Sequence, residues 1–136
     1  MTITGGCVCG SLRYATQDPP QLAGKCYCRD CQRETGTGHM TFVVFPAAGL
    51  AITGEAKDYV RQGDSGSEVV RTFCPSCGST IFGRPAMLGD VVIVRAGTLD
   101  DPSALDMGFA TYASRAHPWD APPAGLTTFD TIPPGV

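Results

Sequence analysis

The chain has 136 residues, 43% of them hydrophobic, and a formal net charge of −3. This length and apolar content predict one folded domain, which we expect to span residues 1–136. No lysine- or arginine-rich run and no stretch as long as a membrane span is present, so we expect neither a nucleic-acid nor a membrane partner.

The predicted elements are almost all strands, because 17 glycines and 11 prolines separate short runs rich in Val, Ile, Phe, Tyr and Thr. The continuously apolar runs 40–45 and 91–94 should lie at the centre of the core. We expect an all-β fold with strands over 12–16, 21–25, 40–45, 50–53, 57–61, 68–73, 80–83, 91–97 and 108–112.

Helix is scarce, and only 29–35 is predicted to form a short helical turn. This segment has no β-branched residue before Thr35, and Gly36 can supply the left-handed residue that ends a helix. The proline-rich segment 118–134 should wrap irregularly over the surface, with Trp119 and Phe129 as packing anchors.

Seven cysteines carry the strongest chemical signal. The first residues lack the basic and apolar regions of a signal peptide, which favours the cytoplasm, where structural disulfides are rare. An odd number of cysteines also cannot be used up by disulfides alone. Metal binding is therefore the leading interpretation.

The spacing of the cysteines suggests two zinc ions per chain. Three clusters are present, namely 7–9, 26–31 and 74–77, and a C-x-x-C pair in a tight turn can place two sulfurs on one ion. Two clusters that each supply two thiolates would complete a tetrahedron, and the remaining cluster would hold a second ion with one coordination position open, as catalytic zinc sites do. The predicted closed site consists of Cys7, Cys9, Cys74 and Cys77, and the predicted open, catalytic site of Cys26, Cys28 and Cys31.

Several alternatives compete with this interpretation. The cysteines of the first set could be free buried thiols, and the middle cluster could be a second structural site completed by His39, His117 or a carboxylate. An iron–sulfur cluster or a redox dithiol ranks lower. Arginines at 71, 84 and 95 interrupt strand patterns; most such arginines cover a solvated face, but one could meet a substrate carboxylate in a pocket.

Three segments together resemble the glutathione-dependent formaldehyde-activating enzyme family, which also includes centromere protein V. They are Gly-Cys-Val-Cys-Gly-Ser-Leu-Arg-Tyr at 6–14, Cys-Tyr-Cys-Arg-Asp-Cys-Gln at 26–32 and Phe-Cys-Pro-Ser-Cys-Gly-Ser-Thr-Ile-Phe at 73–82, and the Pro-Trp pair at 118–119 resembles the family's closing segment. The resemblance implies a β-tent fold, with the 7/9/74/77 set on structural zinc and the 26/28/31 set on catalytic zinc. Tyr27 departs from the histidine that the family often has there.

A zinc ion held by three thiolates suits a soft, exogenous thiolate in its open position better than water. With the resemblance, this favours a carbon–sulfur lyase or synthase that acts on a glutathione–aldehyde adduct such as S-hydroxymethylglutathione, in which the middle cysteines are ligands and not nucleophiles. A zinc-stabilised protein-interaction module, and a lyase or hydrolase for another small electrophile, are the alternatives.

Overall fold

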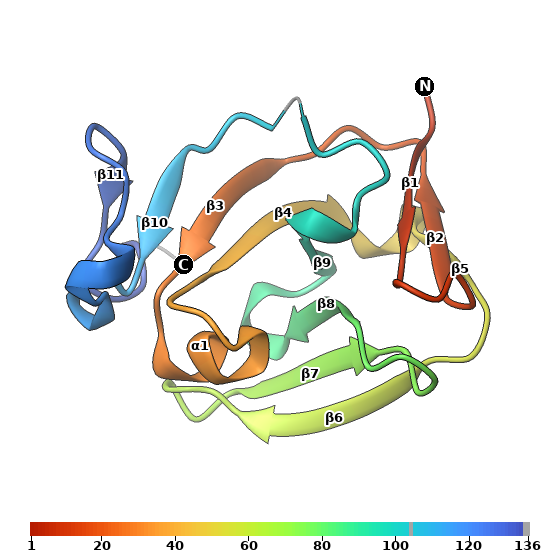
Figure 1. Ribbon diagram of the computed structural model, residues 1–136, viewed down its shortest axis with the longest axis horizontal. Helices are drawn as coiled ribbons and strands as arrows, with labels where there is room; N and C mark the ends of the chain where they lie inside the picture. Colours follow the sequence, from red (N-terminus) through yellow and green to blue (C-terminus); the bar gives the residue numbers. More distant parts are fainter. Residues whose placement is uncertain (104, 135–136) are drawn as a thin grey trace.

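The computed structural model describes residues 1–103 and 105–134, and its strands form two sheets (Figure 1). The larger sheet has eight strands in the order β11-β10-β3-β4-β9-β8-β7-β6, and the smaller has three in the order β1-β2-β5. The elements are β1 (Ile3–Gly6), β2 (Arg13–Thr16), β3 (Leu22–Cys26), α1 (Arg29–Thr35), β4 (Met40–Pro46), β5 (Ala51–Thr53), β6 (Lys57–Gln62), β7 (Glu68–Phe73), β8 (Thr80–Pro85), β9 (Val91–Arg95), β10 (Phe109–Thr111) and β11 (Thr127–Thr128).

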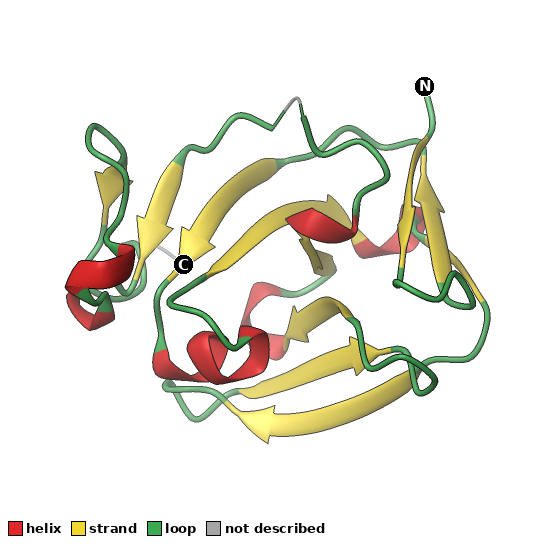
Figure 2. Ribbon diagram, in the orientation of Figure 1, coloured by secondary structure: helices red, strands yellow, loops and turns green. Residues whose placement is uncertain are grey.

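The predicted all-β class is confirmed. Strands dominate the chain and α1 is the one α-helix in the described part, while the remaining helical segments are short 3-10 turns (Figure 2). Strand pairing is antiparallel except at β10, which runs parallel to both β3 and β11. No helix among the described residues has the length and apolar character that a membrane crossing requires.

Each of the nine predicted strands corresponds to an observed one, with ends shifted by at most two residues, and the predicted helical turn matches α1. The strand predicted over 91–97 ends at Arg95, because Ala96–Thr98 turns into a 3-10 segment. The short strands β1 and β11 were not predicted, since the first is half glycine and the second has only two residues.

The main core lies between the two sheets. Strand side chains alternate between faces, so every second residue of β4 and β9 points toward the three-stranded sheet. These side chains pack against Leu12 and Tyr14 from the β1–β2 region, both nearly inaccessible. The buried cluster is completed by residues of both sheets and of the cysteine turns: Cys7, Ala23, Val43, Phe45, Cys74, Ile81, Phe82, Val92, Val94 and Leu99.

The other face of the large sheet carries a second apolar cluster. Cys26, Met40, Phe42 and Val44 point to this side, and Cys31 of α1 packs against them. Figure 1 shows α1 between the β3–β4 part and the β6–β7 part of the curved sheet. The helix therefore covers only one end of this face.

Helix α1 is short, and it is capped at both ends. The backbone N–H of Cys31 donates to the Cys28 sulfur at the N-terminus, and Gly36 adopts a left-handed φ of 75° at the C-terminus. Gln32 anchors the buried side of the helix, because its amide donates to the backbone oxygens of Tyr27 and Arg115 at 2.8 and 3.1 Å. The cysteines that flank the start of α1 are thereby fixed relative to β3.

Candidate functional site

Two tight turns bring the first and third cysteine clusters together. In the first turn the N–H of Gly10 donates to the Cys7 carbonyl, and in the second the N–H of Gly78 donates to the Cys74 carbonyl. Both glycines have φ near 80°, a conformation that residues with a Cβ rarely adopt. Each turn therefore presents its two sulfurs on one side.

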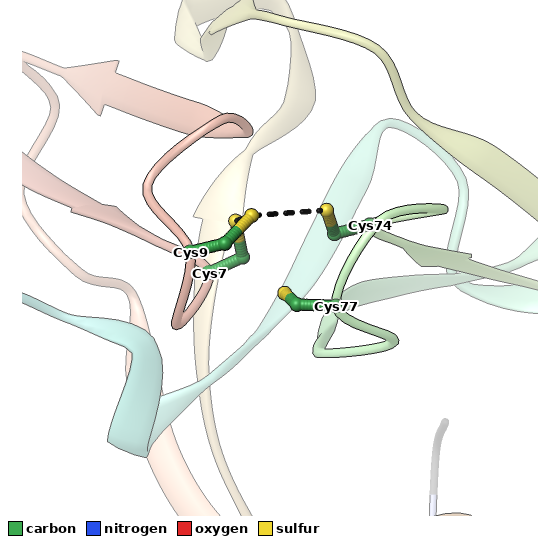
Figure 3. Close-up of side chains that lie close together, drawn as sticks. All are labelled: Cys7, Cys9, Cys74 and Cys77. Carbon is green, nitrogen blue, oxygen red and sulfur yellow. Dashed lines mark hydrogen bonds between the residues drawn. The ribbon is translucent and has the colours of Figure 1, made fainter.

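The four sulfurs of Cys7, Cys9, Cys74 and Cys77 all lie within 4.8 Å of one another (Figure 3). The sulfur separation is 3.6 Å between Cys7 and Cys9 and 3.8 Å between Cys9 and Cys74. A tetrahedron with metal–sulfur distances of about 2.3 Å has edges of about 3.8 Å. The spacing of this group, called the four-cysteine cluster below, fits a zinc ion.

Hydrogen bonds favour the ionised thiol at two positions of the four-cysteine cluster, Cys7 and Cys77. The backbone N–H of Leu12 donates to Cys7 and lowers its pKa to about 7, although burial opposes the shift. The hydroxyl and backbone of Ser79 lower the pKa of Cys77 to about 5. Thiolates are the form in which cysteine binds zinc, so the surroundings suit a bound cation.

The middle cysteines form a separate group, called the three-cysteine cluster below. Cys26 ends β3, Cys28 caps α1 and Cys31 lies in its first turn, and their sulfurs are all within 4.8 Å of one another. Cys26 and Cys31 are buried and Cys28 is half-buried. Among the described residues no histidine or carboxylate belongs to this cluster.

The thiols of the three-cysteine cluster oppose one another's ionisation. Hydrogen bonds from Cys28 and Cys31 lower the pKa of Cys26 to about 3. The hydrogen bond with Cys26 raises the pKa of Cys28. Hydrogen bonds with Cys26 and Cys28, together with burial, raise the pKa of Cys31 well above its ordinary value. One thiolate is thus stabilised at the expense of its neighbours. A divalent cation would remove this competition, and soft sulfur donors suit zinc.

Neither histidine joins the clusters. Nδ1 of His39 lies 2.6 Å from the Asp120 carboxylate, and Nε2 of His117 lies 3.0 Å from the Gln32 side-chain oxygen. Trp119, predicted to anchor the C-terminal segment, is instead 70% exposed and stacks on His117. That prediction is wrong, because the segment is held by hydrogen bonds and by Phe129, which packs edge-on against Phe109.

A cleft of about 480 Å³ opens from the three-cysteine cluster. All three of its cysteines line the cleft, whereas the four-cysteine cluster contributes none of the lining. The volume falls within the range of small-molecule sites, roughly 300–1,000 Å³. The two clusters therefore differ in access as well as in the number of sulfurs.

A buried ion-pair network forms one wall of the cleft. Glu34 of α1 accepts from Arg61 Nε at 3.0 Å and from Arg95 Nη2 at 2.9 Å, and Arg61 also reaches Asp30 at 3.2 Å. The side chains of Glu34 and Arg95 are only 8% and 12% exposed, and Arg95 Nε is buried without a partner. Burial lowers the pKa of Arg95.

The sequence indicated that one of Arg71, Arg84 and Arg95 could lie in a pocket, and of these three only Arg95 lines the cleft. The roles of Glu34 and Arg61 were not predicted. Asp30 and Glu34 are four positions apart, so one face of the predicted helical turn is acidic, and this pattern was the signal available.

Two tyrosines near the three-cysteine cluster differ in role. Tyr112 lines the cleft and has φ of 54°, the one positive φ among the described non-glycine residues. Such strained backbone tends to occur at functional sites. Tyr27, which replaces the family's frequent histidine, is fully buried with its ring 5.1 Å from that of His39, and it is not part of the cleft lining.

Comparison with known proteins agrees with these features. The family model described as glutathione-dependent formaldehyde-activating enzyme matches residues 2–115. The fold is similar to the crystal structure of a Rhodobacter sphaeroides protein, with a TM-score of 0.57 and 18% sequence identity over 71% of this chain and 87% of that one. The chain belongs to the glutathione-dependent formaldehyde-activating enzyme family.

Proposed function

We propose that this protein is a zinc enzyme that forms or cleaves the carbon–sulfur bond between glutathione and an aldehyde. One observation carries the proposal: the three-cysteine cluster opens into a cleft of substrate size, and the four-cysteine cluster does not. Cys7, Cys9, Cys74 and Cys77 would hold a structural zinc ion, and Cys26, Cys28 and Cys31 a catalytic one. When bound there, zinc would supply an open coordination position that stabilises a deprotonated thiol.

The charges of the cleft suit glutathione, which has two carboxylates and one ammonium group. Four arginines line the cleft, namely Arg29, Arg61, Arg95 and Arg115. Glu34 engages two of them, whereas Arg115 lies over the Tyr112 ring and makes one long carboxylate contact, of 3.5 Å, with the exposed Asp64. The Arg115 guanidinium is therefore available to bind a substrate carboxylate in a bidentate manner.

The proposed reaction needs no oxidant or reductant. The glutathione sulfur bonds to the aldehyde carbon, the π electron pair of the carbonyl moves to its oxygen, and the proton lost by the thiol ends on that oxygen. Cleavage reverses each of these movements. Burial raises the pKa of Tyr112, which keeps its phenol protonated near neutral pH, so its hydroxyl is a candidate proton donor to that oxygen.

Cobalt substitution tests thiol binding directly. Replacement of a weaker ligand by a fourth sulfur should strengthen the thiolate-to-metal charge-transfer band, so glutathione should change the spectrum of the cobalt protein. Cys28→Ser should lose that change. If saturating glutathione left the spectrum unaltered at a site shown to be open, thiol binding would be excluded and the proposal would fail.

A matched pair of arginine variants tests the carboxylate contact. Arg115→Gln should raise KM for glutathione about tenfold or more, because it removes a charged hydrogen bond. Arg84→Gln is the control: Arg84 is similarly exposed and also pairs with one aspartate, but it does not line the cleft. Equal KM values in the two variants would exclude a role of Arg115 in binding.

A further inference from the structure

The floor of the cleft has a pattern that a one-carbon substrate does not explain. Neighbouring strands place their cleft-facing residues in rows across the sheet. The row nearest the three-cysteine cluster contains Cys26 and Met40. The next contains Phe109, Gly24 and Phe42, and the third Leu22, Val44 and Ile93. We call the side chains of these second and third rows, together with Met40, the apolar floor.

The apolar floor is long. Leu22 lies four residues before Cys26 on the same strand, which corresponds to roughly 13 Å at the usual rise of a strand residue. Beyond it, Val91, Met87 and Leu88 continue the apolar lining. Leu22 and Met87 are 45% and 43% exposed, so large apolar side chains face solvent inside the cleft.

Two aromatic rings pack closely against Gly24 in the middle of the apolar floor. Its strand neighbours are Phe42 and Phe109, whose rings meet edge to face with centroids 5.9 Å apart. A Cβ at position 24 would come within 2.8 Å of the Phe109 carbonyl oxygen and 3.2 Å of the Phe42 ring. Glycine is therefore needed for this close packing, which places two edge-to-face aromatic rings in the middle of the floor.

Apart from Arg95, the charged residues of the cleft lie outside the apolar floor. Arg29, Asp30 and Glu34 come from α1, Arg61 and Asp64 from β6 and the loop after it, and Arg115 from the 3-10 turn that follows β10. Arg95 pairs with Phe42 and so adjoins the second row of the floor. A substrate group that extends from the three-cysteine cluster along the apolar floor therefore meets apolar side chains, while charged groups face it from the other walls.

From this arrangement we propose that the aldehyde carries an apolar chain or ring, which lies along the apolar floor while glutathione occupies the charged walls. The inference rests on the proposed function and narrows its substrate class to medium-chain or aromatic aldehydes and their S-(1-hydroxyalkyl)glutathione adducts. Formaldehyde has no substituent to place there. Glutathione, with its charged ends and peptide groups, gains little from an apolar surface.

The bond chemistry is unchanged by the larger substituent. The same sulfur–carbon bond forms, the carbonyl electron pair moves to oxygen, and the thiol proton ends there. What changes is the binding free energy, because each methylene placed on the apolar floor leaves water.

A series of aldehydes of increasing length tests the inference in the zinc-loaded protein with glutathione present. We expect kcat/KM to rise about threefold to fourfold per methylene from ethanal to hexanal, the factor for full burial of a methylene. Leu22→Gln should flatten this rise. Ile52→Gln is the matched control, since Ile52 is 44% exposed but lies on β5, away from the cleft.

A binding experiment separates failure of the inference from failure of the proposed function. Calorimetry compares S-hexylglutathione with S-methylglutathione, neither of which can react. We expect the hexyl compound to bind at least tenfold tighter, and Leu22→Gln to reduce that ratio while Ile52→Gln leaves it unchanged. If Leu22→Gln does not fold, as judged by its melting curve, Leu22→Ala takes its place.

The outcomes are distinct. Turnover of formaldehyde with no dependence on chain length, and equal affinity for both glutathione derivatives, would overturn the apolar-substrate inference and leave the proposed function intact. Tighter hexyl binding without turnover of any aldehyde would support the inference about the cleft but reject carbon–sulfur bond formation. If light scattering showed a dimer that Leu22→Gln dissociates, the apolar floor would be an interface between copies, and the inference would also be wrong.

Discussion

Glu34 offers a sharp test of what holds the wall of the cleft together. Its carboxylate accepts from Arg61 and from Arg95, at 3.0 and 2.9 Å, and its side chain is 8% exposed. Glu34→Gln keeps the shape of the side chain but removes its charge. Arg61 would keep its contact with the half-exposed Asp30, whereas Arg95 would lose the carboxylate with which it pairs.

The expected loss is about 3 kcal/mol of unfolding free energy. Removal of one partner from a buried ion pair costs roughly 3–5 kcal/mol, because the other charge stays buried and uncompensated. Both arginines border the cleft and are reached by water there, which places the expectation at the low end. Asp30→Asn is the control, since a pair this exposed contributes about 1 kcal/mol or less.

Urea denaturation with excess zinc measures both variants, so that metal occupancy does not differ between them. The double variant Glu34→Gln with Arg95→Met should recover part of the loss, because it removes the cation that Glu34→Gln leaves without a carboxylate partner. If Glu34→Gln unfolded within about 1 kcal/mol of the parent protein, the network would not be an important source of stability and the reasoning would be refuted.

Two further predictions concern stability away from the cleft. Burial raises the pKa of Tyr14 to about 12, so the stability that its neutral phenol contributes should be present below pH 10 and lost between pH 10 and 12. Unfolding curves of Tyr14→Phe, measured as a function of pH, should lack that part of the alkaline loss of stability. Equal pH profiles of the parent protein and the variant would contradict this prediction. Asp120→Asn should lower the unfolding free energy by about 1 kcal/mol, because the carboxylate that accepts from His39 at 2.6 Å links the 118–120 turn to the start of β4. Amide hydrogen exchange in residues 113–120 should become faster in the variant. Unchanged exchange rates would argue against a stabilising role of this contact.

The sequence predicted strand positions well because local chemistry decides them here. The runs 40–45 and 91–94 became neighbouring central strands, since continuous apolar sequence requires cover on both faces. The partition of the cysteines could be predicted from their number and spacing, and the structure brings the same two groups of sulfurs together. Whether each group holds zinc remains a prediction.

The cleft could not be predicted from the sequence, because it depends on pairing between distant strands. Leu22 and Ile93 are 71 positions apart and meet only through their shared neighbour Val44. A strand pattern says which residues share a face but not which strands are adjacent. The ion pair between Glu34 and Arg95 depends on the same long-range pairing, so it could not be predicted from the positions of the two residues in the sequence.

Burial and metal binding lead to opposite expectations about which cysteine substitution, one in each cluster, destabilises the protein more. Cys77 is exposed and Cys28 is half-buried. If side-chain burial alone set the cost, Cys77→Ala would be nearly neutral, within about 0.5 kcal/mol, and a change at Cys28 would be the more harmful. Zinc binding reverses the order, because a structural zinc ion contributes roughly 10 kcal/mol or more to the folding of a small site.

We therefore expect Cys77→Ala to lower the unfolding free energy by several kcal/mol in zinc, leaving much of the chain unfolded. Cys28→Ser should remain folded and bind about one zinc per chain instead of two, as measured by elemental analysis of the dialysed protein. A strong chelator supplies the control, since it should bring the parent protein down to the stability of Cys77→Ala. A loss of several kcal/mol would indicate metal linkage, because the solvent-exposed side chain of Cys77 offers no other source for it. Native-like melting of Cys77→Ala in zinc would instead show that the four-cysteine cluster has no structural metal.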